Sequence, residues 1–561
     1  MSLSRARLLL LAAAVLSAAS TARIEVHPAA ACPDSRKNGA TVTVCSLVDA
    51  AGFIHRNSVG PTTTTHICLH PGVHTLREPL RLNASHSGSR WTRCPQVDPA
   101  AAGPRAVISG GLRVPAGSWR PEAGGIWAAP LPAGAPVLHV RTLWVSGVRA
   151  NRTVLNASSV LGDLQVTATG YVSQHPVPWQ ADAEDVELNY FQQLAPWQAQ
   201  RCVLSHAAGH RLTVTQPCFA TISRNAAAVP GLPRNRSSGR SGCADSDPEC
   251  GLEGNPLGSG LPMFIENVPL ADPGLPEGDG ACPGRFSFSP KSQVLYYRPH
   301  PHELSADGTA FTAEAVVPVA EGLVAAVGLR DASFSAIDFE HMAWNSPSGP
   351  AGFVDLQDGV TALGYIPGGL DCMNCSDVSV TECGFEKLGG SGVTFNGVAQ
   401  RISMAGLRVR DVSGNGIAIG ASRGNDSRPF QSVDNTVTDC VVSYAGQEYT
   451  GAVGVTAGYN VGLVLSHNTV ENVPYGAFSV GAGAARPGYA RNNTVSYNRV
   501  ARFMLKMSVQ TLGMLILLEP FPSRICRCRR CACAAAAPHA PWRCALLDAH
   551  AHRVLIDFFA Y

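Results

Sequence analysis

Hydrophobic residues recur at a regular interval along the C-terminal half of the chain. Each repeat begins with an apolar residue, and these residues are 24 to 33 positions apart, at Phe385, Val409, Val442, Val470 and Val500. Intervals of this size are typical of stacked repeats such as solenoids. The segments between them are short, rich in β-branched residues and bounded by Gly, Asn or Asp, which favours strands over helices. The pattern therefore predicts a solenoid of parallel strands.

Small polar and glycine positions support the same prediction. A glycine followed by a small or branched apolar residue closes most repeats, at Gly392, Gly416, Gly454 and Gly476. Asn435, Asn468 and Asn493 lie at the starts of the strand-like runs, where we expect their amides to bond to the neighbouring coil. A solenoid presents one long flat face, so extended polymers are its expected ligands.

Composition agrees with a large β-rich protein and narrows the class of partner. Charged residues make up 15% of the 561 residues, and 56 residues are glycine, as short strands joined by tight turns require. The net charge is +2 and there is no basic stripe outside the last segment. This balance argues against a nucleic-acid partner.

The N-terminus and the sequons predict secretion. Residues 1–22 have the form of a signal peptide, with Arg5 and Arg7 before an apolar run and small residues near the cleavage site. The run of about nine apolar residues is too short to span a bilayer, so we expect no transmembrane anchor. Seven glycosylation sequons begin at Asn83, Asn151, Asn156, Asn235, Asn374, Asn425 and Asn492.

Cysteine usage fits an oxidising compartment. Thirteen of the 18 cysteines precede residue 510. The local groups that could pair are Cys32 with Cys45, Cys68 with Cys94, Cys202 with Cys218, Cys243 with Cys250, and Cys372, Cys375 and Cys383 among themselves. Spacing alone does not fix the connectivity. The CxxC at Cys372 and Cys375 lacks a thioredoxin-like context, so we expect a structural disulfide or buried thiols there.

The chain divides into five segments. Residues 1–22 are the predicted signal peptide, 23–110 the first coils, 111–320 a β-rich subdomain inserted into the solenoid or packed on it, and 321–508 the repeats. Residues 509–561 have no strand period and contain five cysteines within 19 residues. We interpret this tail as a gene-model artefact; a processed tail and a metal or disulfide knot are the alternatives.

Three stretches resemble a known family. FEHMAWNSPSGPAGFVDLQDG (339–359), GQEYTGAVGVTAGYN (446–460) and LSHNTVENVPYGAFSVGAG (465–483) resemble secreted right-handed parallel β-helix proteins of the pectate-lyase-like superfamily. Within it they are similar to the group around glycoside hydrolase family 141. Upstream, AVISGG, LWVSGVRANR, FIENVPLADPG and LYYRPHP resemble that group's accessory region, so the likeness covers about residues 40–507.

The resemblance implies an all-β fold, a right-handed parallel β-helix of the pectin-lyase type with an inserted β-rich subdomain, and activity on polysaccharides or glycans. The group continues after NRVARFMLKMS with an acidic DGG-type motif and further coils, where this chain reads VQTLGM. The resemblance therefore also implies that an active-site acid and the last coils are missing, so the chain as given is expected to be inactive.

Paired carboxyl groups are the expected chemistry. Glycosidases place two of them about 5 to 5.5 Å apart for retention or about 6.5 to 9.5 Å apart for inversion. Glu386, Asp411, Glu448 and Glu471 each lie five or six positions before a closing glycine, which predicts a column of carboxylates. Asp411 and Glu448 lie closest to the family pattern and are the predicted catalytic acids; solvated turn acids are the alternative. His467 is a candidate for proton transfer, or a histidine satisfied within its coil.

Aromatic residues are candidates for binding sugar. The expected substrate-binding residues are Tyr449, Tyr459, Tyr475, His341 and Trp344, although a tryptophan in a β-helix more often serves packing. Asp355 and Asp358 could bind calcium or sugar, but a turn role is favoured. We expect no cofactor and no metal.

The sequence thus predicts a secreted glycoside hydrolase acting on a polysaccharide or glycan. A non-catalytic carbohydrate-binding or cell-surface protein is the first alternative. A polysaccharide lyase is the second, but it needs clustered basic residues near calcium-binding acids; Arg408 and Arg410 are separated by one residue and could share a face, yet no acid cluster of a calcium site is evident. Neither the sugar nor the oligomeric state follows from the sequence.

Overall fold

A computed structural model describes most of the chain. The described residues are 22–29, 37–38, 41–57, 64–95, 105–132, 137–179, 185–191, 199–223, 261–270, 282–353, 360–361, 364–420, 432–481 and 491–505. The predicted signal peptide, apart from Ala22, and the segment 509–561 lie outside these ranges, as do Asp355 and Asp358.

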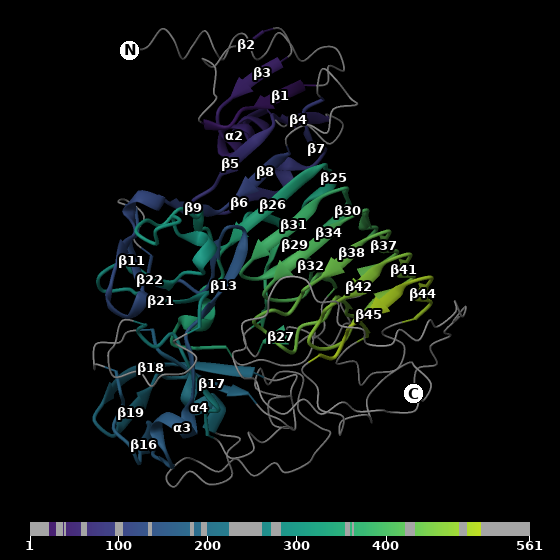
Figure 1. Ribbon diagram of the computed structural model, residues 1–561. Helices are drawn as coiled ribbons and strands as arrows, with labels where there is room; N and C mark the ends of the chain where they lie inside the picture. The colour runs from purple at the N-terminus through teal and green to yellow at the C-terminus, as the bar shows by residue number, and fades with distance from the viewer. Residues whose placement is uncertain are drawn as a thin grey trace, which may run out of the picture.

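Three long sheets of almost entirely parallel strands stack into a solenoid, which runs from the purple N-terminal strands to the yellow C-terminal ones (Figure 1). The first solenoid sheet contains, in spatial order, β2 (Lys37–Asn38), β3 (Thr41–Val44), β1 (Ala22–Val26), β4 (Thr65–Leu69), β7 (Ser89–Arg93), β25 (Arg330–Ser335), β30 (Ser376–Thr381), β33 (Ser403–Ala405), β37 (Thr436–Thr438), β41 (Val464–Ser466) and β44 (Thr494–Ser496). The second contains β5 (Gly72–Thr75), β8 (Ala106–Ser109), β26 (Ile337–Met342), β31 (Gly384–Leu388), β34 (Arg408–Val412), β38 (Val441–Ser443), β42 (Thr469–Glu471) and β45 (Arg499–Ala501). The third contains β6 (Leu80–Asn83), β24 (Val324–Val327), β29 (Gly368–Met373), β32 (Ser391–Asn396), β35 (Ile417–Ile419), β39 (Val455–Ala457) and β43 (Phe478–Val480).

The register of the second solenoid sheet confirms the repeat read from the sequence. Phe385 pairs with Val409, Val409 with Val442, Val442 with Val470, and Val470 with Val500. The first four side chains are buried in one continuous hydrophobic core that fills the solenoid. The interval between the apolar anchors is therefore the length of one rung.

Three of the closing glycines, Gly392, Gly416 and Gly454, are required by the close approach of neighbouring rungs. A Cβ atom on Gly416 would lie 2.4 Å from the carbonyl oxygen of Gly454 and 2.4 Å from Cγ1 of Val442. A Cβ atom on Gly392 would lie 2.3 Å from the carbonyl oxygen of Gly416. Since such contacts are shorter than van der Waals packing allows, a side chain at these positions would force the rungs apart.

Buried asparagines link successive coils, as the sequence predicts. Asn435 accepts a hydrogen bond from the Ile402 amide at 2.9 Å and donates to the Ala399 carbonyl at 3.0 Å. Asn468 accepts from the Cys440 amide at 3.0 Å and donates to the Val437 carbonyl at 2.9 Å. These amides satisfy backbone groups that the turns leave unpaired inside the core.

One helix near the N-terminus differs from the sequence prediction, which expected only strands in this region. Helix α2 (Leu47–Asn57) begins after Ser46, whose hydroxyl accepts a hydrogen bond from the Asp49 amide at 3.0 Å. Leu47, Ala50 and Ile54 are spaced as one helical face and are buried in the solenoid core. The helical period was present in the sequence, but the preceding β-branched run masked it.

Two further sheets, mostly antiparallel, lie beside the solenoid (Figure 1). β6, β7 and β8 pair directly with β24, β25 and β26, so the chain between Ser109 and Val324 leaves the solenoid and rejoins it at the next rung. One sheet contains β10 (Arg120–Pro121), β11 (Trp127–Pro130), β22 (Val294–Arg298), β21 (Arg285–Ser289), β13 (Val148–Arg152), β12 (Leu143–Val145), β23 (Ala315–Pro318) and β9 (Gly111–Val114). The other contains β14 (Val154–Asn156), β20 (Phe264–Glu266), β17 (Glu187–Phe191), β18 (Ala199–Ala208), β19 (Arg211–Val214), β16 (Gly170–Ser173) and β15 (Leu164–Val166). We refer to these two sheets together as the antiparallel region.

The antiparallel region has hydrophobic clusters of its own. Trp119, Phe286 and Tyr297 belong to one cluster, and Tyr171, Tyr190 and Phe219 to the other. The short helices α3 (Ala157–Leu161) and α4 (Cys218–Ser223) pack in the second. The remaining described elements are the strand pairs β27 (Val360–Thr361) with β28 (Gly364–Tyr365) and β36 (Ser432–Val433) with β40 (Asn460–Val461), and the 3-10 turns η2 (Ala84–His86), η3 (Ala116–Ser118), η4 (Ala123–Gly125), η6 (Pro301–Glu303) and η7 (Ser346–Ser348).

Two of the expected disulfides are present, Cys68–Cys94 and Cys202–Cys218. Cys372, Cys375 and Cys383 do not pair among themselves; all three are buried thiols in the core, so of the two alternatives expected at the CxxC the buried thiols are present and the disulfide is not. Within the described residues, no helix is long and apolar enough to cross a membrane.

Candidate functional site

A polar pocket lies where the antiparallel region meets the solenoid. Its volume is about 490 Å³, within the range of small-molecule sites. The solenoid contributes the segment between β38 and β39, and β13, β17, β18, β20 and β21 contribute most of the rest. The charged residues that line it are Arg141, Arg149, Arg152, Arg201, Arg285, Glu266 and Glu448.

Glu448 is held at the pocket by arginines of the antiparallel region. Nε of Arg141 donates to Oε1 of Glu448 at 3.0 Å, and a second nitrogen of the same guanidinium also contacts this oxygen. Arg201 donates to the Glu448 backbone carbonyl at 3.0 Å. The other carboxylate oxygen, Oε2, is buried and has no hydrogen-bond partner among the described residues. One oxygen of Glu448 is therefore fixed, and the other remains available for a new bond.

The arginines behind Glu448 belong to a buried ionic network. Glu187 is fully buried; it contacts Arg141, accepts from Arg152 at 3.0 Å and accepts from the Ser348 hydroxyl at 2.7 Å. Burial alone would raise the pKa of Glu187, but Arg141 and Arg152 lower it below its usual range. The same balance holds for Glu266. Burial would raise its pKa, but Arg201 and Arg152 lower it below the usual value. The network therefore consists of ions rather than neutral groups.

Asp411 is held by the β12–β13 hairpin. Arg149 donates to Oδ1 of Asp411 at 2.6 Å, and the indole nitrogen of Trp144 donates to Oδ2 at 3.1 Å. Arg149 also donates to the Ser413 hydroxyl at 3.0 Å, and the Ser413 carbonyl accepts from the Glu448 amide at 3.3 Å. Asp411 and Glu448 are thus connected through Arg149 and Ser413.

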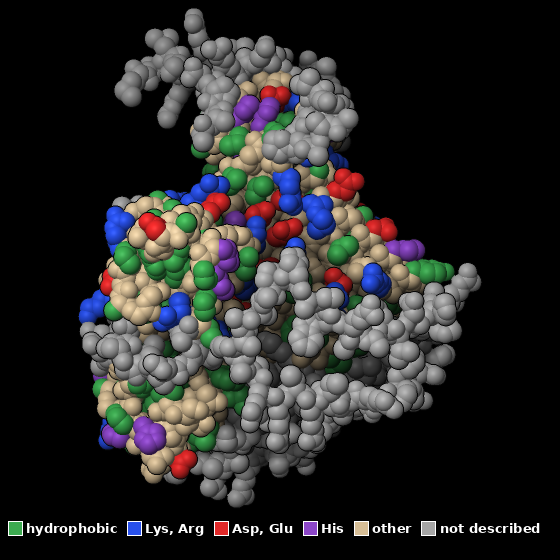
Figure 2. Space-filling view, viewed as in Figure 1, with side chains coloured by type: hydrophobic (Ala, Val, Ile, Leu, Met, Phe, Trp, Pro, Cys, Tyr) green, Lys and Arg blue, Asp and Glu red, His purple; other side chains and the backbone are tan. Residues whose placement is uncertain are grey.

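The predicted column of four carboxylates is wrong. Glu386 pairs with Glu340 on one side and Arg410 on the other, so its column contains Arg410 and not Asp411. Asp411 is one residue further along, at a rung corner with φ of 53°, and Glu448 lies in the longer connection between β38 and β39. These strands carry charges of both signs, which pair across neighbouring rungs, as Asp338 does with Arg408 and Glu340 with Lys387. Figure 2 shows red and blue side chains interspersed on the visible face of the molecule.

His341 occupies the same corner position as Asp411, two rungs away, with φ of 58°. Its ring packs edge-on against Trp144 at 5.7 Å between centroids, and Nδ1 lies 3.2 Å from the Ser109 hydroxyl. Burial, with Lys387 and Arg113 nearby, lowers the pKa of His341 to about 3. His341 is therefore a neutral neighbour of the Trp144–Asp411 contact.

The predicted aromatic binding residues are mostly packing residues. Tyr449 is fully buried in the solenoid core, where it contacts Trp344 and Phe353 at 5.1 and 4.4 Å between ring centroids. Tyr459 and Tyr475 are 8% and 9% exposed, too little for an open stacking surface. Trp344 supports the Glu448 segment through Tyr449 rather than bordering the pocket.

His467 is not brought to this site. It is exposed at the corner between β41 and β42 and stacks on Tyr497 at 5.1 Å between centroids. It is not one of the pocket residues.

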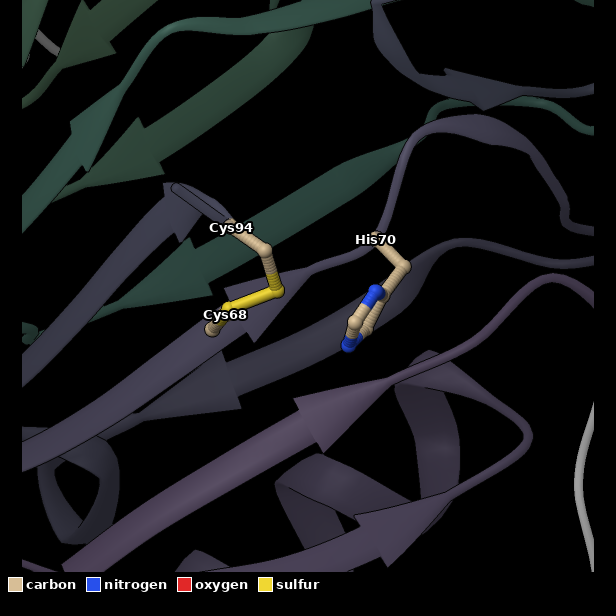
Figure 3. Close-up of side chains that lie close together, drawn as sticks. All are labelled: Cys68, His70 and Cys94. Atoms are coloured by element: carbon tan, nitrogen blue, oxygen red, sulfur yellow. A yellow bond between two sulfur atoms is a disulfide. The ribbon is translucent and has the colours of Figure 1, made fainter. Parts of the chain in front are cut away.

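Two groups of potential metal ligands occur among the described residues, and both include His70. Cys68, His70 and Cys94 lie together, but the two cysteines form a disulfide and so have no thiolate to offer (Figure 3). Glu25, His27 and His70 also have ligand atoms within 4.8 Å of one another. Both groups lie in the first coils and share no residue with the pocket.

The arginines are the part of the site that sequence reasoning missed. Arg149 and Arg152 were visible in the stretch LWVSGVRANR, three positions apart in one short strand. Arg141, Arg201 and Arg285 carry no local signal, because their partners are distant in sequence. Arg141 and Glu448, for example, are 307 positions apart.

Comparison with known proteins supports the fold. No family model matches the chain, and no curated protein matches it significantly. A solved structure described as a glycoside hydrolase matches with a TM-score of 0.62 at 18% identity, covering 87% of this chain and 84% of that chain. Another, titled "The complex structure of XylC with xylose", reaches a TM-score of only 0.40 at 9% identity, with coverage of 82% and 60%. At these identities the likeness is one of fold: the chain is a parallel β-solenoid similar to that of a known glycoside hydrolase.

Proposed function

We propose that the chain is a carbohydrate-active enzyme, a glycoside hydrolase, that binds a glycan at the pocket and uses the carboxyl groups of Glu448 and Asp411. The observation that carries the proposal is the state of Glu448. One of its oxygens is fixed by Arg141, while Oε2 is buried without a donor. Such an oxygen is costly to bury, and a sugar hydroxyl in the pocket is the donor that it lacks.

The contacts favour different roles for the two acids. The Arg141 guanidinium fixes Oε1 of Glu448 and leaves Oε2 without a donor among the described residues, an arrangement that suits a nucleophile or a base. Asp411 is the second carboxyl group, and its partner Arg149 itself lines the pocket. A ligand that draws Arg149 toward itself would free an oxygen of Asp411, which could then take the catalytic role that Glu448 does not take. The geometry gives no support to proton transfer by His467, which is exposed and stacked on Tyr497.

The test is the loss of hydrolysis in Glu448→Gln and Asp411→Asn. Asparagine tolerates the positive φ of position 411, so the second variant removes the charge with little backbone strain. Acid–base groups typically contribute about 10²- to 10⁴-fold, and losses of this size are expected in reducing-end release from a polysaccharide panel. Glu386→Gln and Glu471→Gln are the matched controls, because both acids lie on the solenoid outside the pocket. If all four variants release sugar at the parental rate, Glu448 and Asp411 are not catalytic.

A carbohydrate-binding protein without catalysis is the second candidate. It is favoured because Glu448, Glu266, Glu187 and Asp411 are all paired with arginines, so none of these four carboxyl groups is free of a cationic partner. Such a protein would bind glycans from the same panel without turnover. Clustered arginines also suit a polysaccharide lyase, and unsaturated product ends would identify that reaction.

We further infer secretion, a right-handed winding of the solenoid and an inserted subdomain at residues 111–320. Two disulfides are compatible with an extracellular protein. Connections between parallel strands of one sheet are right-handed in about 98% of cases. Separate hydrophobic clusters support the subdomain. Expression in a secreting host should give a mature protein that begins near residue 23; retention of the uncleaved chain in the cell would count against secretion.

A further inference from the structure

The pocket contains more positive charge than its acids neutralise. Five arginines line it, and four acids pair with them: Glu187, Glu266, Glu448 and Asp411. Arg285 has no ion pair among the described residues, and its guanidinium donates only to the Arg152 backbone carbonyl, at 3.3 Å. Its side chain is partly exposed at the pocket. Arg285 is thus the uncompensated cation of the site.

Arg152, the neighbour of Arg285, has N–H donors that form no hydrogen bond among the described residues. Its Nη1 is bound to Glu187 at 3.0 Å, but Nε and Nη2 are buried with no hydrogen-bond partner among the described residues. Its side chain is only 6% exposed. Since buried N–H groups of a cation are expensive to leave unbonded, this pair of arginines is incomplete without an acceptor.

We propose that the pocket binds a negatively charged sugar unit, with Arg285 and Arg152 as the groups that recognise its anion. The anion is the carboxylate of a hexuronic acid or a sulfate ester, since both offer several acceptor oxygens to a planar guanidinium. The volume of about 490 Å³ suits one or two sugar units. The proposal rests on the proposed function, because it names the substrate class of the same pocket.

The remaining arginines do not explain this excess. Arg141, Arg149 and Arg201 each hold a carboxylate and a backbone or hydroxyl oxygen, as a purely structural network would. Of the five pocket arginines, Arg285 alone has no ion pair with a described residue. It is therefore the residue whose removal separates ligand binding from scaffolding.

The experiment measures binding by calorimetry on the full-length protein. The probes are a trigalacturonic acid and its carboxyl-reduced counterpart, and a sulfated galactose oligosaccharide and its desulfated counterpart. The variant is Arg285→Met. The matched control is Arg298→Met, since Arg298 is directly opposite on the neighbouring strand, donates to the Gly124 carbonyl and does not line the pocket. Thermal unfolding of each variant checks that it is folded, and Arg285→Lys, which keeps the charge, serves if the methionine variant is not.

At least one charged probe is expected to bind tenfold or more tightly than its neutral counterpart, and the stronger of the two identifies carboxylate or sulfate. Arg285→Met should remove this preference, Arg285→Lys should retain part of it, and Arg298→Met should leave it intact. Equal affinity for charged and neutral forms, no binding of either charged probe, or a preference that survives Arg285→Met would each overturn the proposal.

The two proposals fail separately. If the charged probe binds through Arg285 but no bond is cleaved, the substrate class stands and hydrolysis is refuted. If neutral glycans are cleaved through Glu448 without any preference for charge, hydrolysis stands and the anionic substrate is refuted.

Discussion

Replacing Arg141 with methionine removes one of the residues that join the antiparallel region to the solenoid. Its side chain is 1% exposed and contacts Glu187 on one side and Glu448 and Ser348 on the other. Methionine keeps an unbranched apolar stem of similar width but lacks the guanidinium. The substitution therefore removes the ion pairs and hydrogen bonds and retains only the packing of the aliphatic part of the side chain.

The expected loss in the free energy of unfolding comes from the buried carboxylates that lose Arg141 as a partner. Among the described residues, Glu187 would keep Arg152 as its only ionic partner, and no side chain would donate to Glu448. Breaking a buried ion pair by removing one partner typically costs about 3 to 5 kcal/mol, because the other charge stays buried. By contrast, the Arg401–Asp377 pair is about half exposed on both sides, and exposed pairs contribute little to stability because water screens them. Arg401→Met is thus a control with the same chemical change.

Urea unfolding followed by tryptophan fluorescence measures the free energy of unfolding of the parent and both variants. Arg141→Met should lose several times more than Arg401→Met. The double variant Arg141→Met/Glu187→Met should regain part of the loss, since the orphaned charge is then removed as well. If Arg141→Met costs no more than the exposed control, the network does not hold the pocket together.

Two further perturbations address the solenoid and its neutral histidine. Gly416→Ala should destabilise the protein by about 1 to 3 kcal/mol, as overpacking does, because the new Cβ would lie 2.4 Å from the Gly454 carbonyl oxygen. Gly117→Ala is the control, because a Cβ there meets nothing within 4 Å and should change the free energy of unfolding little. Equal effects of the two substitutions would contradict the close contact between rungs. The pKa of about 3 for His341 lies below the value of about 6.5 in an unfolded chain, so the unfolded state takes up the proton first and stability should fall as the pH drops from 6.5 toward 3. His341→Gln should reduce the slope of the unfolding free energy against pH between about 6.5 and 4.5, a range that lies above the protonation of Glu187 and Glu266. An unchanged slope would show that His341 is not the responsible group.

The solenoid could be predicted from the sequence because its period is fixed by its own core. Each rung buries one apolar anchor against the next, so Phe385, Val409 and Val442 had to recur in the sequence as they stack in space. Helix α2 was missed because its apolar face is short and follows the strand Thr41–Val44 directly. The periodicity of the sequence therefore predicted the stacking of the rungs but not helix α2, which packs on the first coils.

The site was only partly predictable, for two physical reasons. Counting back from the closing glycine assumes rungs of equal length, yet Val442 and Gly454 are 12 positions apart, whereas Val409 and Gly416 are 7 apart. The extra residues contain Glu448, which therefore leaves the strand column and reaches the pocket. In addition, the arginines that hold Glu448 and Asp411 come from the antiparallel region, and no local pattern records contacts over 260 to 310 positions.

These contacts make the antiparallel region part of the site rather than a decoration of the solenoid. Asp411 is oriented by Trp144 and Arg149 of one hairpin, and Glu448 by Arg141 and Arg201. The solenoid supplies the two acids at positions set by its rungs, whereas the antiparallel region supplies the cations that fix their orientation and the uncompensated charge of Arg285. Because the two parts fold around separate hydrophobic clusters, residues of the antiparallel region can change without disturbing the stacking of the rungs. We therefore expect ligand preference to be determined by β12, β13 and β21, and the placement of the reactive carboxyl groups by the solenoid.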